Sequence, residues 1–118
     1  LTARQDADLT LANIRTMLDM TRAHDASLPV LLCTVPPSAD PKAPVSDRER
    51  ESLNEGLRAL SQEFDRVALV DVSSAFSDAD GEPDPKFFRA DLLHFSPQGH
   101  ARLKELVAAA LRETGRTT

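Results

Sequence analysis

The stretch VLLCTV (residues 30–35) is a short apolar run that Pro29 and Pro36 bound on either side. A run of this length between prolines is too short for a helix and is typical of a strand buried on both faces. A second run of the same character, VALVDV, follows at residues 67–72. The two runs therefore predict two buried strands.

Helical patterns precede, separate and follow these two runs. Apolar residues recur at three- and four-residue spacing over residues 8–24, 46–64 and 97–113. Ser46-Asp47-Arg48-Glu49 has the composition of a capping box, and Ser96-Pro97 suits the start of the last helix. Helices that alternate with doubly buried strands are typical of a parallel sheet with helices packed on it, so we expect an α/β fold class. The residues expected to face the core from the last helix are Leu103, Leu106, Val107, Ala110 and Leu111.

Two strands do not complete a three-layer sheet of this kind. The 118 residues suffice for one domain, yet at least one strand edge would stay open and apolar. We therefore expect this chain to pair with something along that edge, for instance with a second copy of itself. The sequence begins with Leu1 rather than Met, which indicates a processed product or a fragment.

Charge and composition exclude several classes of partner. The net charge is −5 and the Lys and Arg residues do not cluster, which argues against nucleic acid and anionic membrane surfaces. The longest apolar run is far too short to span a bilayer. No secretory signal is visible, and the location stays unknown, either cytoplasmic or secreted. The single cysteine, Cys33, lies within an apolar run and is expected to be a buried, inert thiol.

Asp91 and His94 stand just before the last predicted helix, separated by Leu92 and Leu93. The polar loop over residues 73–90 brings them to the carboxyl end of the second strand, where catalytic sites of open α/β sheets lie. An Asp-x-x-His turn lets the carboxylate accept the Nδ1 hydrogen and leaves Nε2 free to take a proton from a serine hydroxyl. The two leucines are expected to hold the turn to the core. A structural histidine beside a turn-capping Asp remains the alternative, because this spacing alone is a weak signal.

The residues around this pair extend the pattern. Asp91-Leu92-Leu93-His94-Phe95-Ser96-Pro97-Gln98-Gly99-His100 resembles the last conserved block of the SGNH (GDSL) hydrolases, in which Asp-x-x-His is followed by Gly and an aromatic residue or His at the start of the final helix. Residues 30–35 with Pro36-Pro37 resemble the penultimate strand of that family, and residues 67–71 resemble its last strand. Asn13-Ile14-Arg15 suits the segment after the family's third block. The resemblance covers nearly the whole chain in order and is most specific at the C-terminus.

The resemblance implies a flavodoxin-like three-layer α/β sandwich with a parallel sheet, of which this chain would supply the C-terminal strands and helices. Residues 1–118 would then be the C-terminal portion of a single SGNH-hydrolase-like domain. It also implies a serine esterase acting on carboxylic esters, such as acetylated carbohydrates or lipid acyl esters. His94 would be the general base and Asp91 the residue that orients it. No cofactor and no metal are expected.

The functional blocks of the family's N-terminal half are missing from the sequence, so that half, in the same protein or as a separate chain, would be a partner along the open strand edge. The nucleophile of these hydrolases lies in a Gly-Asp-Ser block, and a Gly from a second block and an Asn from a Gly-x-Asn-Asp block donate to the oxyanion. The chain has neither motif, and Asn13 and Asn54 fall within predicted helices. We therefore expect the isolated chain to be inactive. The alternative is a non-catalytic, hydrolase-derived binding or interaction module.

Other candidate sites are weaker. Ser73, Ser74 and Ser96 are near in sequence, but none stands in a glycine-flanked elbow, and Ser96 suits a helix cap. The acidic segment at residues 78–84 resembles a calcium loop, but its glycine is misplaced, so a solvated loop is expected. A nucleotide-binding fold would need a glycine-rich phosphate loop that the sequence lacks.

The surroundings of the candidate pocket are also predicted. The segments at residues 36–45 and 77–88 are expected to flank it, the first as a stiff, extended and exposed loop. Gly99 and His100 are expected to be a packing feature at the start of the last helix rather than catalytic groups.

Overall fold

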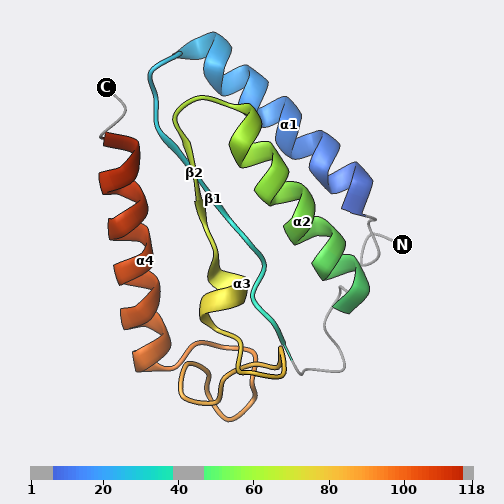
Figure 1. Ribbon diagram of the computed structural model, residues 1–118, viewed down its shortest axis with the longest axis vertical. Helices are drawn as coiled ribbons and strands as arrows, with labels where there is room; N and C mark the ends of the chain where they lie inside the picture. Colours follow the sequence, from blue (N-terminus) through green and yellow to red (C-terminus); the bar gives the residue numbers. More distant parts are fainter. Residues whose placement is uncertain (1–6, 39–46, 116–118) are drawn as a thin grey trace.

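The computed structural model of the protein describes residues 7–38 and 47–115. Its elements form three layers, with one long helix on one side of the strands and two helices on the other (Figure 1). In chain order the elements are α1 (Ala7–His24), β1 (Val30–Cys33), α2 (Asp47–Glu63), β2 (Val67–Val70), α3 (Val72–Ala75) and α4 (Pro97–Gly115). The predicted α/β fold class is confirmed.

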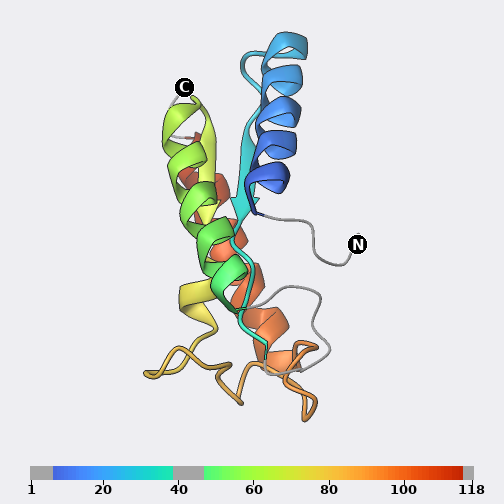
Figure 2. The ribbon, with the colours of Figure 1, turned by 90° about the vertical axis from the view of Figure 1, so that its right-hand side faces the viewer.

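β1 and β2 pair in parallel, with Val30 opposite Val67 and Cys33 opposite Val70. The backbone N–H of Thr34 extends this ladder by donating to the carbonyl of Val70 at 3.0 Å. α2 connects the two strands, as a parallel pair requires. Both strands point to the end of the sheet where α3 and the long segment before α4 lie (Figures 1 and 2).

β1 is less buried than predicted. Val30, Leu31 and Leu32 are only partly buried and Cys33 is exposed, so the prediction of a buried thiol is wrong. α4 packs mainly on β2, and within the described residues β1 has no strand on its other side. Partial burial of the sulfur still raises the pKa of the Cys33 thiol.

Aromatic side chains hold the segment between β2 and α4 to the sheet. Phe76 is fully buried, and its ring centroid lies 5.2 Å from that of Phe87, 5.9 Å from Phe88 and 4.7 Å from Phe95. The prediction of a polar loop over residues 73–90 is therefore wrong for its aromatic residues, which belong to the core. The hydrophobic effect and the ring contacts together fix the part of the chain that carries the candidate site.

α1 packs on α2 through one face and leaves other apolar side chains exposed. Leu18 is buried, and Gly56 of α2 lets Leu11 approach so closely that an added Cβ would lie 2.2 Å from its Cδ1 atom. Met17 and Met20 keep 57% and 66% of their surface exposed. An apolar helix surface of this kind lacks a packing partner within the described residues.

Three smaller predictions need correction or fall outside the described part. Leu111 of α4 is exposed rather than in the core, whereas the other four predicted residues are buried or pack against it. Pro37 is buried, so the segment after β1 does not begin as an exposed loop. The rest of that loop and the predicted cap Ser46 lie in residues 39–46, outside the described residues.

Candidate active site

The turn that carries Asp91 and His94 is tied together by its own backbone. The N–H of Arg89 donates to the carbonyl of His94 at 2.7 Å, and the N–H of Leu92 donates to the carbonyl of Arg89 at 2.8 Å. Leu92 has a φ of 54°, in the left-handed region that a leucine seldom occupies. The surrounding hydrogen bonds hold this unusual conformation in place.

Within this turn the carboxylate of Asp91 meets the imidazole of His94. Asp91 Oδ2 lies 2.6 Å from His94 Nδ1, and Asp91 Oδ1 accepts the backbone N–H groups of Leu93 at 3.0 Å and His94 at 3.1 Å. The hydrogen bond to the His94 side chain and those two backbone bonds lower the pKa of Asp91 to about 2. An ionised carboxylate can only accept, so Nδ1 carries the hydrogen and, in the neutral ring, Nε2 is the acceptor. The expected pairing of the two side chains is present; its catalytic role remains a prediction.

The two leucines between the pair behave differently. Leu92 packs against the core cluster, as expected. Leu93 is 40% exposed and lines the pocket next to His94. The prediction that both leucines anchor the turn is therefore wrong for Leu93, because the left-handed backbone at Leu92 turns the following residue away from the core.

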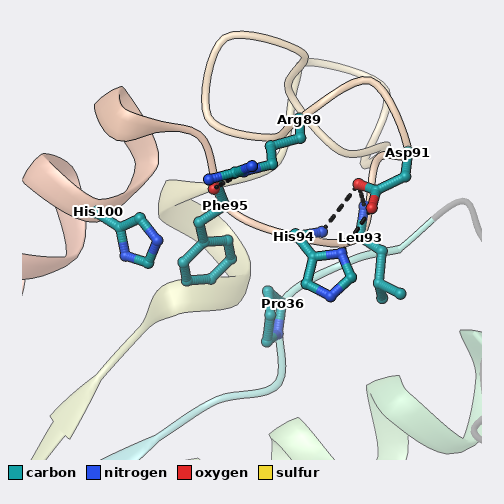
Figure 3. Close-up of a pocket in the computed structure, with 7 residues that line it drawn as sticks. All are labelled: Pro36, Arg89, Asp91, Leu93, His94, Phe95 and His100. Carbon is teal, nitrogen blue, oxygen red and sulfur yellow. Dashed lines mark hydrogen bonds and ion pairs between the residues drawn. The ribbon is translucent and has the colours of Figure 1, made fainter.

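A pocket of about 610 Å³ opens beside the pair (Figure 3). Its lining residues are Pro36, Arg89, Asp91, Leu93, His94, Phe95 and His100. Pro36 comes from the end of β1 and His100 from the first turn of α4, so three separate parts of the chain meet here. Of the segments expected to flank the pocket, that after β1 does so through Pro36; the segment at 77–88 adds no lining residue.

Gly99 and His100 set how the start of α4 meets the turn. A Cβ added to Gly99 would lie 2.1 Å from the carbonyl oxygen of Phe87, so only glycine allows this approach, and the predicted packing role is confirmed. The ring of His100 lies edge-on to Phe95 with 5.7 Å between centroids, which places it in the pocket wall.

Two of the three serines considered as nucleophiles use their hydroxyl groups elsewhere. Ser96 Oγ accepts the N–H of Gly99 at 3.1 Å, as a helix cap does, and donates to the carbonyl of Lys86 at 2.8 Å. Ser74 Oγ donates to Asp71 Oδ2 at 2.9 Å. Within the described residues, none of the pocket's lining residues is a serine.

A polar network at the carboxyl ends of the strands was not predicted. Asp71 follows β2 and accepts hydrogen bonds from Thr34 Oγ1 at 3.0 Å, from Arg58 Nη2 at 3.1 Å, and from the N–H and Oγ of Ser74. Burial acts to raise the pKa of Asp71, but these hydrogen bonds outweigh it and the pKa is lowered. An Asp followed three residues later by Ser at a strand end was the available signal, since such a pair is typical of a helix N-cap.

Asn54 is the second residue that sequence reasoning missed. It lies on α2 and is 2% exposed, and its side-chain amide pairs with the backbone after β1 as a neighbouring strand would. Its Oδ1 accepts the N–H of Val35 at 2.7 Å and its Nδ2 donates to the carbonyl of Val35 at 3.0 Å. Asn54 thereby fixes the backbone immediately before Pro36, a wall of the pocket.

The acidic segment forms a closed turn. Asp78 Oδ1 accepts the N–H groups of Asp80 at 2.9 Å and Glu82 at 3.0 Å, and Gly81 has a φ of 81°. Over residues 7–38 and 47–115, no three potential ligands lie close enough to hold a metal ion. In the same part of the chain, no helix has the length and apolar character that crossing a membrane requires.

Solved structures show the same fold. A Bacteroides fragilis protein assigned as an acylhydrolase superposes with a TM-score of 0.77 at 25% identity, covering 92% of this chain and 52% of its own. A GDSL-like lipase from Bacteroides thetaiotaomicron gives 0.77 at 21% identity, with 92% and 53% covered. The esterase domain of a zebrafish retrotransposon ORF1 protein gives 0.73 at 19% identity, with 95% and 62% covered.

The chain thus spans about half the length of the two Bacteroides structures that it matches. These likenesses confirm the flavodoxin-like α/β sandwich that the sequence predicted. No curated protein matches the chain. The family model of the GDSL-like lipases and acylhydrolases matches residues 1–102. The chain therefore belongs to the GDSL-like lipase/acylhydrolase family, as its Asp91-to-His100 block predicted.

Proposed function

We propose that the protein carrying this chain is a carboxylic ester hydrolase that works by a Ser-His-Asp mechanism, with His94 as general base and Asp91 as the residue that orients it. The observation that carries the proposal is the 2.6 Å contact between Asp91 Oδ2 and His94 Nδ1 at the edge of a pocket. Family membership supports the ester chemistry. Acetylated carbohydrates and lipid acyl esters are the substrate classes that we propose.

The first half of the reaction forms an acyl-enzyme. A serine from outside this chain would attack the ester carbonyl as His94 Nε2 takes the hydroxyl proton, so that the bond from Oγ to carbon forms and the imidazole becomes charged. The negative charge of Asp91 stabilises that imidazolium. The tetrahedral adduct then collapses, the bond to the alcohol oxygen breaks, and Nε2 returns its proton to the leaving alkoxide.

The second half repeats these steps with water. His94 takes a proton from the attacking water, the acyl–oxygen bond to serine breaks, and the proton passes to serine Oγ. The acid and the regenerated enzyme are released. Throughout, Asp91 stays ionised because its lowered pKa lies far below neutral pH.

Exchanging His94 tests this function. In the full-length protein, His94→Ala should lower kcat for an acetylated sugar or a short-chain lipid ester by about 10³-fold, because a general base contributes on this order. His24→Ala is the matched control, since His24 is exposed at the end of α1, away from the pocket. Wild-type activity in His94→Ala would overturn the assignment.

We also propose that residues 1–118 are the C-terminal portion of a single domain whose remaining part supplies the serine and the oxyanion donors. Three features support this: the share of the related structures that the chain spans, the edge of β1 that no described strand covers, and the exposed Met17 and Met20 of α1. The remaining part, in the same chain or a separate one, would add a strand beside β1 and cover those side chains. Without it, the free edge favours self-association.

Cys33 reports on this arrangement, because it is exposed on β1. In the isolated 118-residue chain, Cys33 should react with a thiol reagent, and the chain should be inactive and associate in sedimentation experiments. In the full-length protein, the added strand and its helix should protect the thiol. Equal labelling of both forms, or a monomeric active fragment, contradicts the proposed domain.

A non-catalytic binding module is the second candidate, and the missing Gly-Asp-Ser and Gly-x-Asn-Asp blocks favour it. The sequence upstream of Leu1 in the gene discriminates between the two. Both blocks upstream indicate an enzyme, and their absence indicates a module that has kept the hydrolase fold for binding.

A further inference from the structure

We propose that Arg89 makes the pocket beside His94 selective for esters whose alcohol part carries a negative charge, as a phosphate or a carboxylate. The inference rests on the proposed ester hydrolysis and adds to it a substrate class and a specificity-determining residue. The guanidinium of Arg89, the ring of His100 and the ring of Phe95 together form one wall of the pocket (Figure 3).

The position of Arg89 is fixed by the turn that holds the catalytic pair. Its N–H donates to the carbonyl of His94, and its carbonyl accepts the N–H of Leu92. Its neighbour Phe88 forms an isolated antiparallel β-bridge with Phe95, and the rings of both residues belong to the aromatic core. The backbone of Arg89 therefore has a fixed position relative to His94.

The side chain is directed into the pocket. Nε of Arg89 donates to the carbonyl of Phe95 at 3.3 Å. In Figure 3 the guanidinium points toward Phe95 and His100 and away from Asp91. This one long hydrogen bond uses a single donor of the five that a guanidinium carries.

Several other arginines of the chain pair with carboxylates. Arg15, Arg50, Arg58 and Arg102 each form an ion pair, with Glu63, Asp47, Asp71 and Glu105 respectively, whereas Arg22, like Arg89, donates to backbone carbonyls. Within the described residues, no carboxylate pairs with Arg89. Asp91 forms no ion pair with it either, because the guanidinium is turned away from that carboxylate (Figure 3). A guanidinium placed in this way suits a bidentate phosphate or carboxylate.

The mechanism decides which part of the ester meets Arg89. His94 must lie next to the alcohol oxygen, because it protonates that oxygen when the ester bond breaks. The carbonyl oxygen instead faces the oxyanion donors, which this chain does not supply. A wall on the turn of His94 therefore contacts the alcohol part rather than the acyl part, with Phe95 against its carbon atoms and Arg89 against its charge.

The test compares esters of charged alcohols with esters of neutral ones. For the full-length protein, kcat/KM is measured for glycerol 3-phosphate monoacetate against glycerol monoacetate, and for O-acetylglycolate against O-acetylglycolamide. We expect the charged ester to be preferred in at least one pair, and the pair shows whether phosphate or carboxylate is favoured. In Arg89→Gln, the ratio of charged to neutral kcat/KM should fall by about tenfold, as the loss of a charge-assisted contact at a partly exposed site predicts.

Two variants separate recognition from structure. Arg102→Gln removes the same charge from α4 outside the pocket and should leave the ratio unchanged. Arg89→Lys keeps the charge without the planar fork and should give an intermediate ratio. If Arg89 only braces the carbonyl of Phe95, Arg89→Gln lowers both rates in proportion and the ratio stays constant, which overturns the inference.

A binding measurement keeps the inference open to test if ester hydrolysis itself fails. Glycerol 3-phosphate and glycerol are titrated into the full-length protein by calorimetry. Tighter binding of the phosphate, weakened about tenfold by Arg89→Gln but not by Arg102→Gln, supports an anion-selective pocket even in a non-catalytic protein. Equal binding of the two alcohols overturns the inference and leaves the proposed hydrolysis untouched.

Discussion

Asp91 contacts His94 through both of its carboxylate oxygens: Oδ1 accepts the backbone N–H at 3.1 Å and Oδ2 lies 2.6 Å from ring Nδ1. One residue thereby fixes both the backbone and the ring orientation of the other. In the proposed reaction, this double contact gives Asp91 two duties, holding the turn and stabilising the charged imidazole.

Replacing Asp91 by Asn should impair catalysis more than structure. The amide can still accept the backbone N–H groups of Leu93 and His94, but it no longer stabilises the imidazolium and permits the wrong tautomer. We expect kcat of the full-length protein to fall by about 10³- to 10⁴-fold, and the urea midpoint to fall only modestly, through loss of the charge-assisted contact with His94. Asp80→Asn, which changes an exposed carboxylate in the acidic segment, is the control. Activity near the wild-type level would remove Asp91 from the mechanism.

The ionisation of Asp91 should reflect its hydrogen bonds. Its pKa of about 2 lies below the ordinary 3.8, so the carboxylate stabilises the folded state above pH 3.8. This contribution is lost as the pH falls toward 2. Carbon NMR of the Asp91 carboxyl should show that midpoint. In His94→Ala the midpoint should rise, because the largest cause of the shift is gone. An unchanged midpoint in that variant contradicts the contact.

Asn54→Leu should destabilise the fold. The change leaves the N–H and the carbonyl of Val35 without their side-chain partners in a largely buried site. The expected loss is about 2–6 kcal/mol in the free energy of unfolding, from about 1–3 kcal/mol for each of the two unsatisfied groups. Urea denaturation measures it, and Asn13→Leu on the exposed side of α1 serves as control. Equal stability of the two variants would show that water replaces the lost partners.

Two glycine-to-alanine changes should affect stability to very different degrees. A Cβ at Gly99 meets the Phe87 carbonyl, which is backbone and cannot move aside, so Gly99→Ala should separate α4 from the turn and lower both thermal stability and activity. At Gly56 the obstacle is the flexible side chain of Leu11, and alanine favours the helix by about 1 kcal/mol. Gly56→Ala should therefore cost little, as a thermal melt would show.

The sequence predicted the order and type of the main elements because period and proline placement are local signals. It did not predict that Cys33 is exposed. An apolar run shows that a strand is suited to burial, whereas burial itself depends on neighbours, and β1 has none on one side within the described residues. The core role of Phe76 was missed for a related reason, since an isolated aromatic in a polar segment shows no periodicity.

For the candidate site, too, the local features could be predicted from the sequence and the tertiary ones could not. Asp91 and His94 were paired correctly because only two residues of the chain separate them and the turn geometry is local. The segment that carries Pro36 was expected to flank the pocket, whereas Arg89 and Asn54 were not assigned: the side chain of Arg89 takes its direction from its contact with Phe95, and Asn54 reaches the pocket wall only through the folding of α2. Their side chains are common types whose meaning comes from tertiary position.

The hydrogen-bonded turn that carries Asp91 and His94 also limits how the candidate site can move. Backbone hydrogen bonds join Arg89 to His94 and Phe87 to Ser96, so residues 87–96 are expected to move as one rigid unit. Fluctuations of the domain would move Asp91 and His94 together and leave the distance between their side chains unchanged. In the domain proposed above, thermal opening would therefore change the distance between His94 and the serine hydroxyl, and the rate of reaction would depend on how closely the two parts of the domain pack.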